Sequence, residues 1–201
     1  MANNYIISNP DINKDEIKRR ITQMISDEDI EKYLGKQGHK NIIKYSELKN
    51  YNNIDTLLPK IYDYKIILIE SQQNTGHWIV LLKYKNKDNK IVIEYYNSYG
   101  MKPEADLSYI GNMMNKILGN GKDDLKDLLN NAREKGYEVI YNKKRFQSSN
   151  KKVNTCGRWI LNRIIMMTKF KMDLYDYIDF IDELKKKYDV EADIVVAMLM
   201  P

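Results

Sequence analysis

The spacing of hydrophobic and polar positions divides the chain into a helical start, a strand-rich middle and a helical end. Apolar residues in the first fifty-odd positions approximate helical spacing: Ile12, Ile17, Ile21, Met24 and Ile25. Ser26, in front of "DEDIEKYLG", predicts a helix N-cap, and Gly35 predicts the end of that helix. From residue 64 the period changes, and short β-branched runs at 64–70, 77–84 and 90–96 predict three successive strands.

The second half of the chain returns to helical spacing, with one further strand. The polar stretch "KNKD" separates the second and third strands and predicts an antiparallel hairpin. A fourth strand is expected at 137–141, and helices are expected at 103–118, 123–136, 157–170, 174–188 and 191–200. This order predicts an α+β fold with a small mixed β-sheet packed by helices and a largely buried helix that starts at Cys156.

Length, cysteine content and charge restrict the class of protein. A chain of 201 residues suits one domain with or without an appendage, and its single cysteine excludes an intramolecular disulfide, which is typical of a reducing compartment. No secretory signal is recognisable, and charges interrupt every apolar run before the roughly 20 residues of a membrane span. We therefore expect an intracellular protein with no membrane partner. The net charge of +5 permits contact with a polyanion without requiring it.

The single cysteine lies where a thiol can be reactive. A lone cysteine is more often a small buried hydrophobic residue, but Cys156 is expected at a helix N-terminus, where the dipole and free N–H groups favour thiolate. The backbone N–H groups of Cys156 and Gly157 are candidates for an oxyanion hole, and Gly157 would let a substrate backbone approach. Of the two histidines, His39 is expected on the surface, whereas His77 begins a strand where a polar loop meets the core.

The predicted hairpin supplies a partner for that histidine. A turn centred on Lys87 places His77 opposite Asn97, with Cβ atoms about 5 Å apart. A side-chain carbonyl there would fix the imidazole tautomer and leave the other ring nitrogen for a thiol. A two-residue turn would instead place Ser98 opposite the histidine. Glu94, the charged rival, is expected on the other face of the strand.

Taken in chain order, these pieces resemble a known family. The segments "GHW", "YYNS" and "RFQ…NTCGRW" are similar to the adenovirus-protease and SUMO-protease clan of cysteine peptidases, nearest to the maturation proteases of large DNA viruses (African swine fever virus type) and virophages. The resemblance spans 64–169 and implies an adenain-like, papain-like core. It implies His77 as the base, Asn97 as its orienting group, Cys156 as the nucleophile, Gln147 as the oxyanion side chain and Trp78 as the lining of the substrate channel.

The resemblance also divides the chain and shows departures. Residues 1–55 lie outside it and are read as an N-terminal helical accessory region that shapes the substrate groove or binds a partner, with 56–201 as the catalytic domain. An insertion, "SSNKK", lengthens the segment from Gln147 to Cys156, and Thr155 stands where many relatives have an acid. No second cysteine is present for a disulfide-linked activator peptide.

The function implied is that of a Cys-His-Asn thiol protease. It would cut after Gly-Gly or Gly-X segments through a thioester and process viral structural precursors during particle maturation, in the infected host cytoplasm and the virion. No cofactor or metal is expected, and DNA or a virion protein is a possible activator. Three alternatives stay open: a ubiquitin or SUMO deconjugating isopeptidase, an acetyltransferase of the same clan, and a non-catalytic basic structural or nucleic-acid-binding protein.

Overall fold

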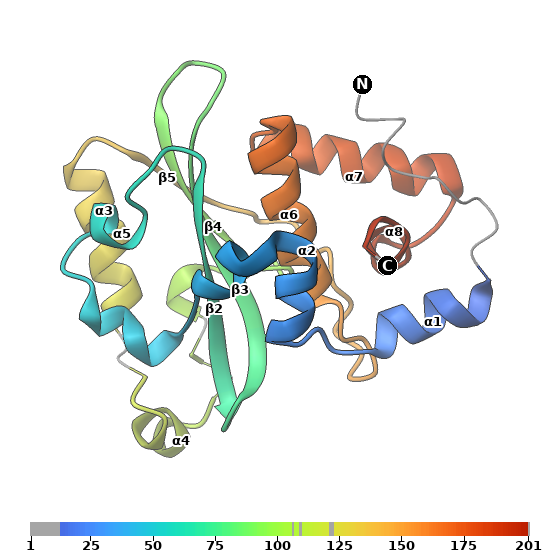
Figure 1. Cartoon of the computed structure of the whole chain (residues 1–201), viewed down its shortest axis with the longest axis horizontal. Helices are drawn as coiled ribbons and strands as arrows, with labels where there is room; N and C mark the ends of the chain where they lie inside the picture. The colour runs from blue at the N-terminus through green and yellow to red at the C-terminus, as the bar shows by residue number, and fades with distance from the viewer. Residues whose placement is uncertain (1–12, 106, 109, 121–122, 201) are drawn as a thin grey trace.

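A five-stranded mixed sheet forms the centre of the computed structural model, which describes residues 13–105, 107–108, 110–120 and 123–200 (Figure 1). The strands lie in sequence order: β1 (Ile42–Lys44), β2 (Asp63–Gln72), β3 (Thr75–Lys85), β4 (Ile91–Tyr96) and β5 (Glu138–Tyr141). Strand β3 runs antiparallel to both of its neighbours, β2 and β4, whereas β1 runs parallel to β2 and β5 runs parallel to β4. The two edge strands are therefore reached by longer connections that carry helices.

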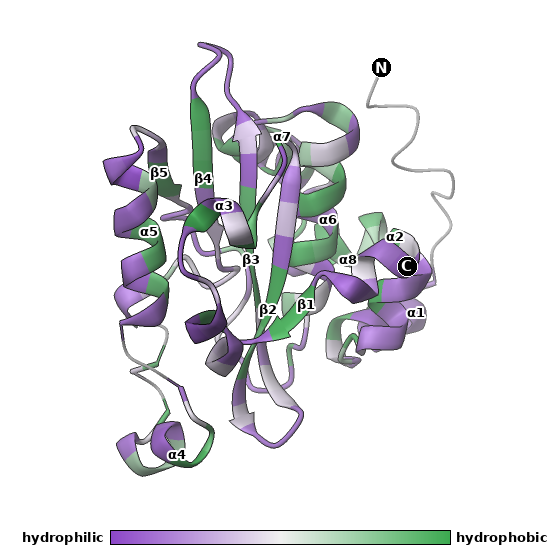
Figure 2. Ribbon diagram, turned by 60° about the vertical axis from the view of Figure 1, so that its left-hand side comes forward, coloured by the Kyte–Doolittle hydropathy of each residue, from purple (hydrophilic) through white to green (hydrophobic). Residues whose placement is uncertain are grey.

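Helices cover both faces of this sheet. The α-helices are α1 (Lys14–Thr22), α2 (Asp27–Lys40), α3 (Ile54–Leu57), α4 (Asn112–Ile117), α5 (Asp124–Glu134), α6 (Cys156–Phe170), α7 (Leu174–Tyr188) and α8 (Ala192–Leu199), with 3-10 turns η2 (Tyr45–Asn50) and η3 (Pro103–Ala105). Helix α6 lies on one face with α2, α7 and α8 around it, and α3 and α5 lie on the other (Figure 1). Helix α4 projects from one end of the molecule (Figure 2). None of the helices in the described residues is long and apolar enough to span a membrane.

Alternation along β3 creates two cores, one on each face of the sheet. Trp78, Val80 and Leu82 pack into the core that contains α6, while Ile79 and Leu81 pack into the core that contains α5. Apolar residues accordingly fill the sheet between the two helical layers (Figure 2). Because both faces of the central strands are covered, β3 is almost entirely buried, and only its ends are available to form a site.

The predicted strands and the predicted helices after residue 120 are confirmed, whereas the helices predicted at the start of the chain and at 103–118 are only partly confirmed. Ser26 caps α2 with a reciprocal capping box, and Gly35, at φ +71°, kinks α2 where an end was expected. The first fifty-odd residues were expected to be helical throughout, which is wrong for β1. This strand has three residues, too few to show the alternation of apolar and polar positions that marks a strand. Helix α1 ends before Met24, and Ile12 lies outside the described residues. The helix expected at 103–118 is limited to η3 and α4 in its described part.

A buried ion pair joins β4 to α6. Arg163 donates to both carboxylate oxygens of Glu94 at 2.8 and 2.6 Å, and both side chains are fully buried. Tyr84 donates to the same carboxylate at 2.7 Å, and its hydroxyl oxygen accepts from the backbone N–H of Leu174, the first residue of α7. Glu94 thus points to the α6 face, as the alternation predicted, and is committed to a structural role.

Candidate active site

A hydrogen bond between His77 and Asn97 lies near the start of β3. Nε2 of His77 is 2.9 Å from Oδ1 of Asn97, and both side chains are buried. The backbone N–H of Tyr99 also donates to Oδ1, and Nδ2 of Asn97 donates to the hydroxyl of Tyr95. Since Oδ1 only accepts, Nε2 must carry the imidazole proton, which leaves the lone pair on Nδ1. The arrangement therefore sets the tautomer that a general base requires.

The strand register that led to this pair was predicted wrongly, although the two side chains do meet. Strand β3 pairs with β4 so that Val80 lies opposite Tyr96, which shifts the pairing by two residues from a turn centred on Lys87. The turn is centred one residue later than expected, at 88, and Asn89 takes a left-handed conformation in it at φ +62°. Strand β4 ends at Tyr96, and the chain then turns so that Asn97 reaches His77 beyond the ladder.

Burial keeps the imidazole of His77 neutral. Burial lowers the pKa of His77 to about 4, against the opposing effect of the Asn97 hydrogen bond. The ring of Tyr99 stacks on the imidazole, with centroids 4.8 Å apart and planes 29° from parallel. A neutral ring with its lone pair on Nδ1 can accept a proton at neutral pH.

The thiol of Cys156 lies at the first residue of α6 and is only partly exposed. Burial raises the pKa of this thiol, while backbone N–H groups of Trp78, Gly157 and Cys156 itself, hydrogen-bonded to the sulfur, act to lower it. The helix N-terminus was expected to favour thiolate, but burial outweighs it. Within the described part of the chain, no hydrogen bond joins the sulfur to His77. The resting pair is therefore a neutral thiol and a neutral imidazole.

The two groups nevertheless share one end of β3. The sulfur accepts from the backbone of Trp78, the residue that directly follows His77. Tyr99 connects them from the other side, because its ring stacks on the imidazole. Burial raises the pKa of the Tyr99 hydroxyl, and the ionised form of Cys156 would raise it further, so the thiol is within electrostatic reach of that hydroxyl. The sulfur of Cys156 therefore lies against the backbone next to His77, and the imidazole of His77 is hydrogen-bonded to Asn97.

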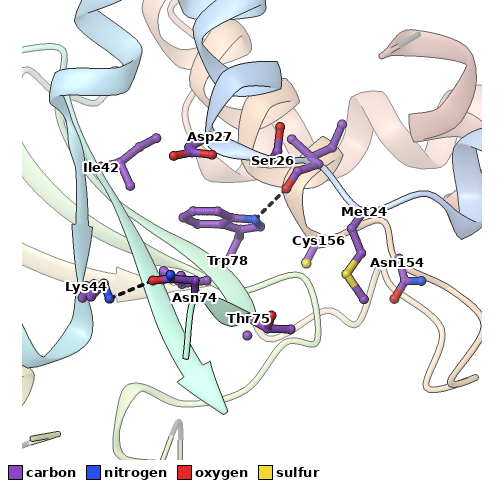
Figure 3. A pocket seen from close by; sticks show the side chains of 13 residues that line it. Met24, Ser26, Asp27, Ile42, Lys44, Asn74, Thr75, Trp78, Asn154 and Cys156 are labelled. Atoms are coloured by element: carbon purple, nitrogen blue, oxygen red, sulfur yellow. Dashed lines mark hydrogen bonds between the residues drawn. The ribbon is translucent and has the colours of Figure 1, made fainter. Parts of the chain in front are cut away.

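A pocket of about 380 Å³ opens beside the thiol (Figure 3). Trp78 forms one wall, and its Nε1 donates to the backbone carbonyl of Ile25 at 3.1 Å. The remaining lining combines apolar residues with a polar margin: Met24, Ser26, Asp27, Ile42, Lys44, Leu68, Asn74, Thr75, Gly76 and Asn154. Trp78 and Cys156 therefore line the same pocket, and the role of Trp78 in a substrate channel stays a prediction.

The linker between α1 and α2 closes one side of this pocket. Asn154 donates to the carbonyls of Ile21 and Thr22, and Arg158 donates to the carbonyl of Gln23, which fastens the linker across the start of α6. Part of the region expected to be accessory, 1–55, therefore lines the pocket, and its strand β1 belongs to the sheet.

Gly157 serves this packing and does not leave open space for a substrate. A Cβ atom at Gly157 would lie 2.5 Å from the Cβ of Ile25, a distance at which one of the two must move. The expectation that the missing side chain admits a substrate backbone is therefore wrong, because Ile25 fills that space. The N–H of Gly157 faces the sulfur, as its hydrogen bond indicates.

Gln147 is buried next to the residue that follows Asn97. Its Oε1 accepts from the Ser98 hydroxyl at 2.7 Å, its Nε2 donates to the carbonyl of Val153 at 3.2 Å, and its backbone N–H donates to the carbonyl of Ser98. These bonds orient the amide and use one of the two hydrogens on Nε2, and the other has no acceptor among the described residues.

Three contributors were missed by sequence reasoning. Tyr99 stacks on the imidazole, and Asn142 brackets Asn97 by accepting from its N–H at 2.9 Å and donating to its carbonyl at 2.7 Å. Asp193 reaches the loop before Cys156 from α8. Tyr99 and Asn142 each follow a predicted strand closely, a position at which polar residues often serve a site. Asp193 lies in an apolar helical segment and gives no such signal.

Comparisons with known proteins concern the fold and the family of the chain. No protein-family model matches the sequence. The uncharacterized protein V9 of Sputnik virophage is 33% identical over 158 residues, which cover 79% of this chain and 84% of V9. The crystal structure of the ASFV pS273R protease superposes with a TM-score of 0.50 at 10% identity, covering 97% of this chain and 70% of that chain. The predicted likeness to viral proteases of this type is confirmed as a likeness of fold, and the chain belongs to the family of the virophage protein V9.

Proposed function

We propose that this protein is a cysteine endopeptidase with Cys156 as the nucleophile and His77 as its general base. The observation that carries the proposal is the buried hydrogen bond between His77 Nε2 and Asn97 Oδ1. It lies at the start of β3, where the backbone N–H of the following residue, Trp78, is directed at the Cys156 sulfur. A base with a fixed tautomer, a thiol at a helix N-terminus and an adjoining pocket are the parts that thiol acyl transfer needs. The fold of the ASFV pS273R protease supports the same conclusion.

The proposed reaction begins from the neutral pair. As the Cys156 sulfur attacks the scissile carbonyl carbon, its proton passes to Nδ1 of His77, so the thiolate forms only during attack. The new S–C bond gives a tetrahedral oxyanion, and its collapse breaks the C–N bond while the imidazolium protonates the leaving amine. Water, deprotonated by the same imidazole, then hydrolyses the thioester and restores the thiol.

Oxyanion stabilisation is assigned to one side chain and the helix start. The free N–H of the Gln147 amide and the backbone N–H groups of Cys156 and Gly157 are the donors. Asn97 fixes the imidazole without adding charge. Because Trp78 and Ile25 narrow the approach to the thiol, we propose that the substrate carries Gly-Gly or Gly-X at the cut.

We further propose a role in viral particle maturation. The support is the family relationship to a virophage protein together with the fold shared with a viral protease. On this proposal the substrates are viral structural precursors, processed in the infected cell and the virion, and DNA or a virion protein activates the enzyme.

The test is hydrolysis of peptides that contain a central Gly-Gly-X segment, followed by mass spectrometry, with and without DNA and candidate virion proteins. We expect cleavage after glycine by the wild-type protein, no cleavage by Cys156→Ala, and unchanged cleavage by His39→Ala, which removes the exposed histidine of α2. Failure of the wild-type protein to cut any peptide under all of these conditions would contradict the proposal. Labelling of Cys156 by ubiquitin or SUMO vinyl-sulfone probes would redirect it to deconjugation.

A further inference from the structure

We propose that Asp193 is a positioning residue that holds the nucleophile and the oxyanion loop in a fixed relation; this inference rests on the proposed function. Asp193 belongs to α8, 37 residues beyond Cys156 along the chain, yet its carboxylate is buried against the loop that leads into α6. Oδ1 accepts from the Thr155 hydroxyl at 2.5 Å and from Nε1 of Trp159 at 3.3 Å, and Oδ2 accepts from the backbone N–H of Ser148 at 2.8 Å.

The two loop residues that donate to this carboxylate, Ser148 and Thr155, indicate what it does. Thr155 directly precedes Cys156, and Ser148 directly follows Gln147. The insertion "SSNKK" begins at Ser148, so one carboxylate ties the segment together at both ends. A longer loop has more conformations to lose when its ends are fixed, and the bonds from Asp193 offset that loss. Gln147 and Cys156 can then keep a constant separation despite the insertion.

The composition of this cluster points to a role beyond stability. In the described residues no lysine or arginine forms an ion pair with Asp193, and all three hydrogen-bond donors are neutral groups. A buried carboxylate without a counter-charge is costly, and a neutral residue would fill the same space at lower cost. The carboxylate also accepts from groups on different segments with its two oxygens, which an amide cannot do because one of its ends only donates.

The site also feels the negative charge of Asp193. Burial raises the pKa of Tyr99, and the carboxylate of Asp193 adds to that rise, which places Asp193 within electrostatic reach of the Tyr99 hydroxyl. The ring of Tyr99 stacks on His77, so a single side chain links the carboxylate to the imidazole. Thr155 itself makes no side-chain cap bond in α6, because its hydroxyl is donated to Asp193.

The test compares Asp193→Asn, Thr155→Val and Thr155→Ser with wild type in the full chain. We expect Asp193→Asn and Thr155→Val to lower kcat for a Gly-Gly-X peptide by about 10- to 100-fold with KM within threefold, because a small misplacement of reacting groups is costly. Thr155→Ser keeps the hydroxyl and should retain kcat within threefold. Asp55→Asn, which removes a carboxylate bound to Lys83 and Lys135 on the opposite face of the sheet, controls for general loss of stability.

A second readout does not depend on hydrolysis. Hydrogen exchange of the Ser148 amide should accelerate at least about 10-fold in Asp193→Ala, because the side chain that accepts its hydrogen bond is removed, and should not change in Asp55→Asn. Unchanged Ser148 exchange, or losses of kcat that Asp55→Asn reproduces, would overturn the proposal. If the wild-type protein cuts no peptide, the proposed function fails, and the exchange measurement alone still decides whether Asp193 holds the loop.

Discussion

Two buried polar clusters lie between the sheet and the helices that cover it, and they are built on opposite principles. In the first, Glu94 and Arg163 form a fully buried ion pair whose hydrogen bonds extend to Tyr84. In the second, the described residues supply the imidazole of His77 with a single hydrogen-bond partner, the amide of Asn97, and the neighbouring Cys156 sulfur lies against backbone N–H groups. The first holds full charges and the second holds none on its reacting groups.

The titration behaviour of the two clusters follows from this difference. The pair with Glu94 raises the pKa of Arg163 against the effect of burial, so the guanidinium stays charged. Burial lowers the pKa of His77 and raises that of Cys156, so both stay neutral. A closed ion pair stabilises β4 against α6, whereas a neutral acid and base beside a pocket can exchange a proton when a substrate arrives. The predictions below test this contrast, beginning with the largest effect.

Removal of the thiol should separate activity from stability most completely. We expect Cys156→Ala to reduce peptide cleavage to the background rate, because the nucleophile is lost. The free energy of unfolding should change by less than about 1 kcal/mol, since only a small, partly exposed group is removed. Cleavage assays and urea denaturation of the same preparation provide both numbers. Residual cleavage above background would mean that another residue attacks the substrate.

Disruption of the ion pair between Glu94 and Arg163 should mainly lower the free energy of unfolding. Arg163→Met leaves the carboxylate of Glu94 buried without its partner, which typically costs about 3–5 kcal/mol of the free energy of unfolding. The double variant Glu94→Gln with Arg163→Met should recover much of that loss, because no charge is left uncompensated. A double variant as unstable as the single one would show that packing, and not charge, dominates this cluster.

The pH dependence of stability should report the neutral state of His77. The folded pKa of about 4 lies below the unfolded value of 6.5, so the unfolded chain binds the proton first as the pH falls. The stability contributed by this residue is therefore complete above pH 6.5 and is lost between 6.5 and 4, by about 3 kcal/mol. Urea denaturation at several pH values should show this loss in wild type, and His77→Gln should reduce the slope. Equal slopes in both proteins would contradict the assignment.

Exchange of the orienting amide for a carboxylate should have the smallest effect. Asn97→Asp keeps an acceptor at the Oδ1 position, so we expect cleavage within about tenfold of wild type. The added charge should raise the pKa of His77, and the acid limb of the pH–rate profile should move to higher pH. Loss of cleavage in a folded Asn97→Asp protein would show that the amide does more than orient the ring.

Local pattern was enough to predict most of the fold. The helices α6, α7 and α8 and the strands β2 to β5 lie close to their predicted positions, because long apolar periods and β-branched runs dominate those segments. Strand β1 is three residues long and carries no period, so only its pairing with β2 defines it. The hairpin register depended on one left-handed residue, Asn89, which pattern alone does not reveal.

The candidate site was predictable in its residues and less so in its surroundings. The sequence singled out His77, Asn97 and Cys156 through their places at a strand start, a strand end and a helix start. The structure joins His77 to Asn97 by a hydrogen bond and places the Cys156 sulfur against the backbone of Trp78, while the catalytic roles stay a prediction. The contribution of the linker at Ile25 and the reach of Asp193 were not predictable, because both depend on tertiary contacts between distant segments. The space beside Gly157 was wrongly assigned to a substrate because its contact with Ile25, from a distant segment, was not predictable either.

The most direct test of the central claim is labelling of Cys156 by a peptide vinyl sulfone that ends in Gly-Gly, followed by mass spectrometry in wild type, His77→Ala and His39→Ala. We predict an adduct on Cys156 in wild type and His39→Ala, with a rate that rises through the pKa of His77 near 4. Labelling of His77→Ala should be about 10²- to 10⁴-fold slower, the usual contribution of a general base. Equal rates in wild type and His77→Ala, or no adduct on the folded wild-type protein, would contradict the account.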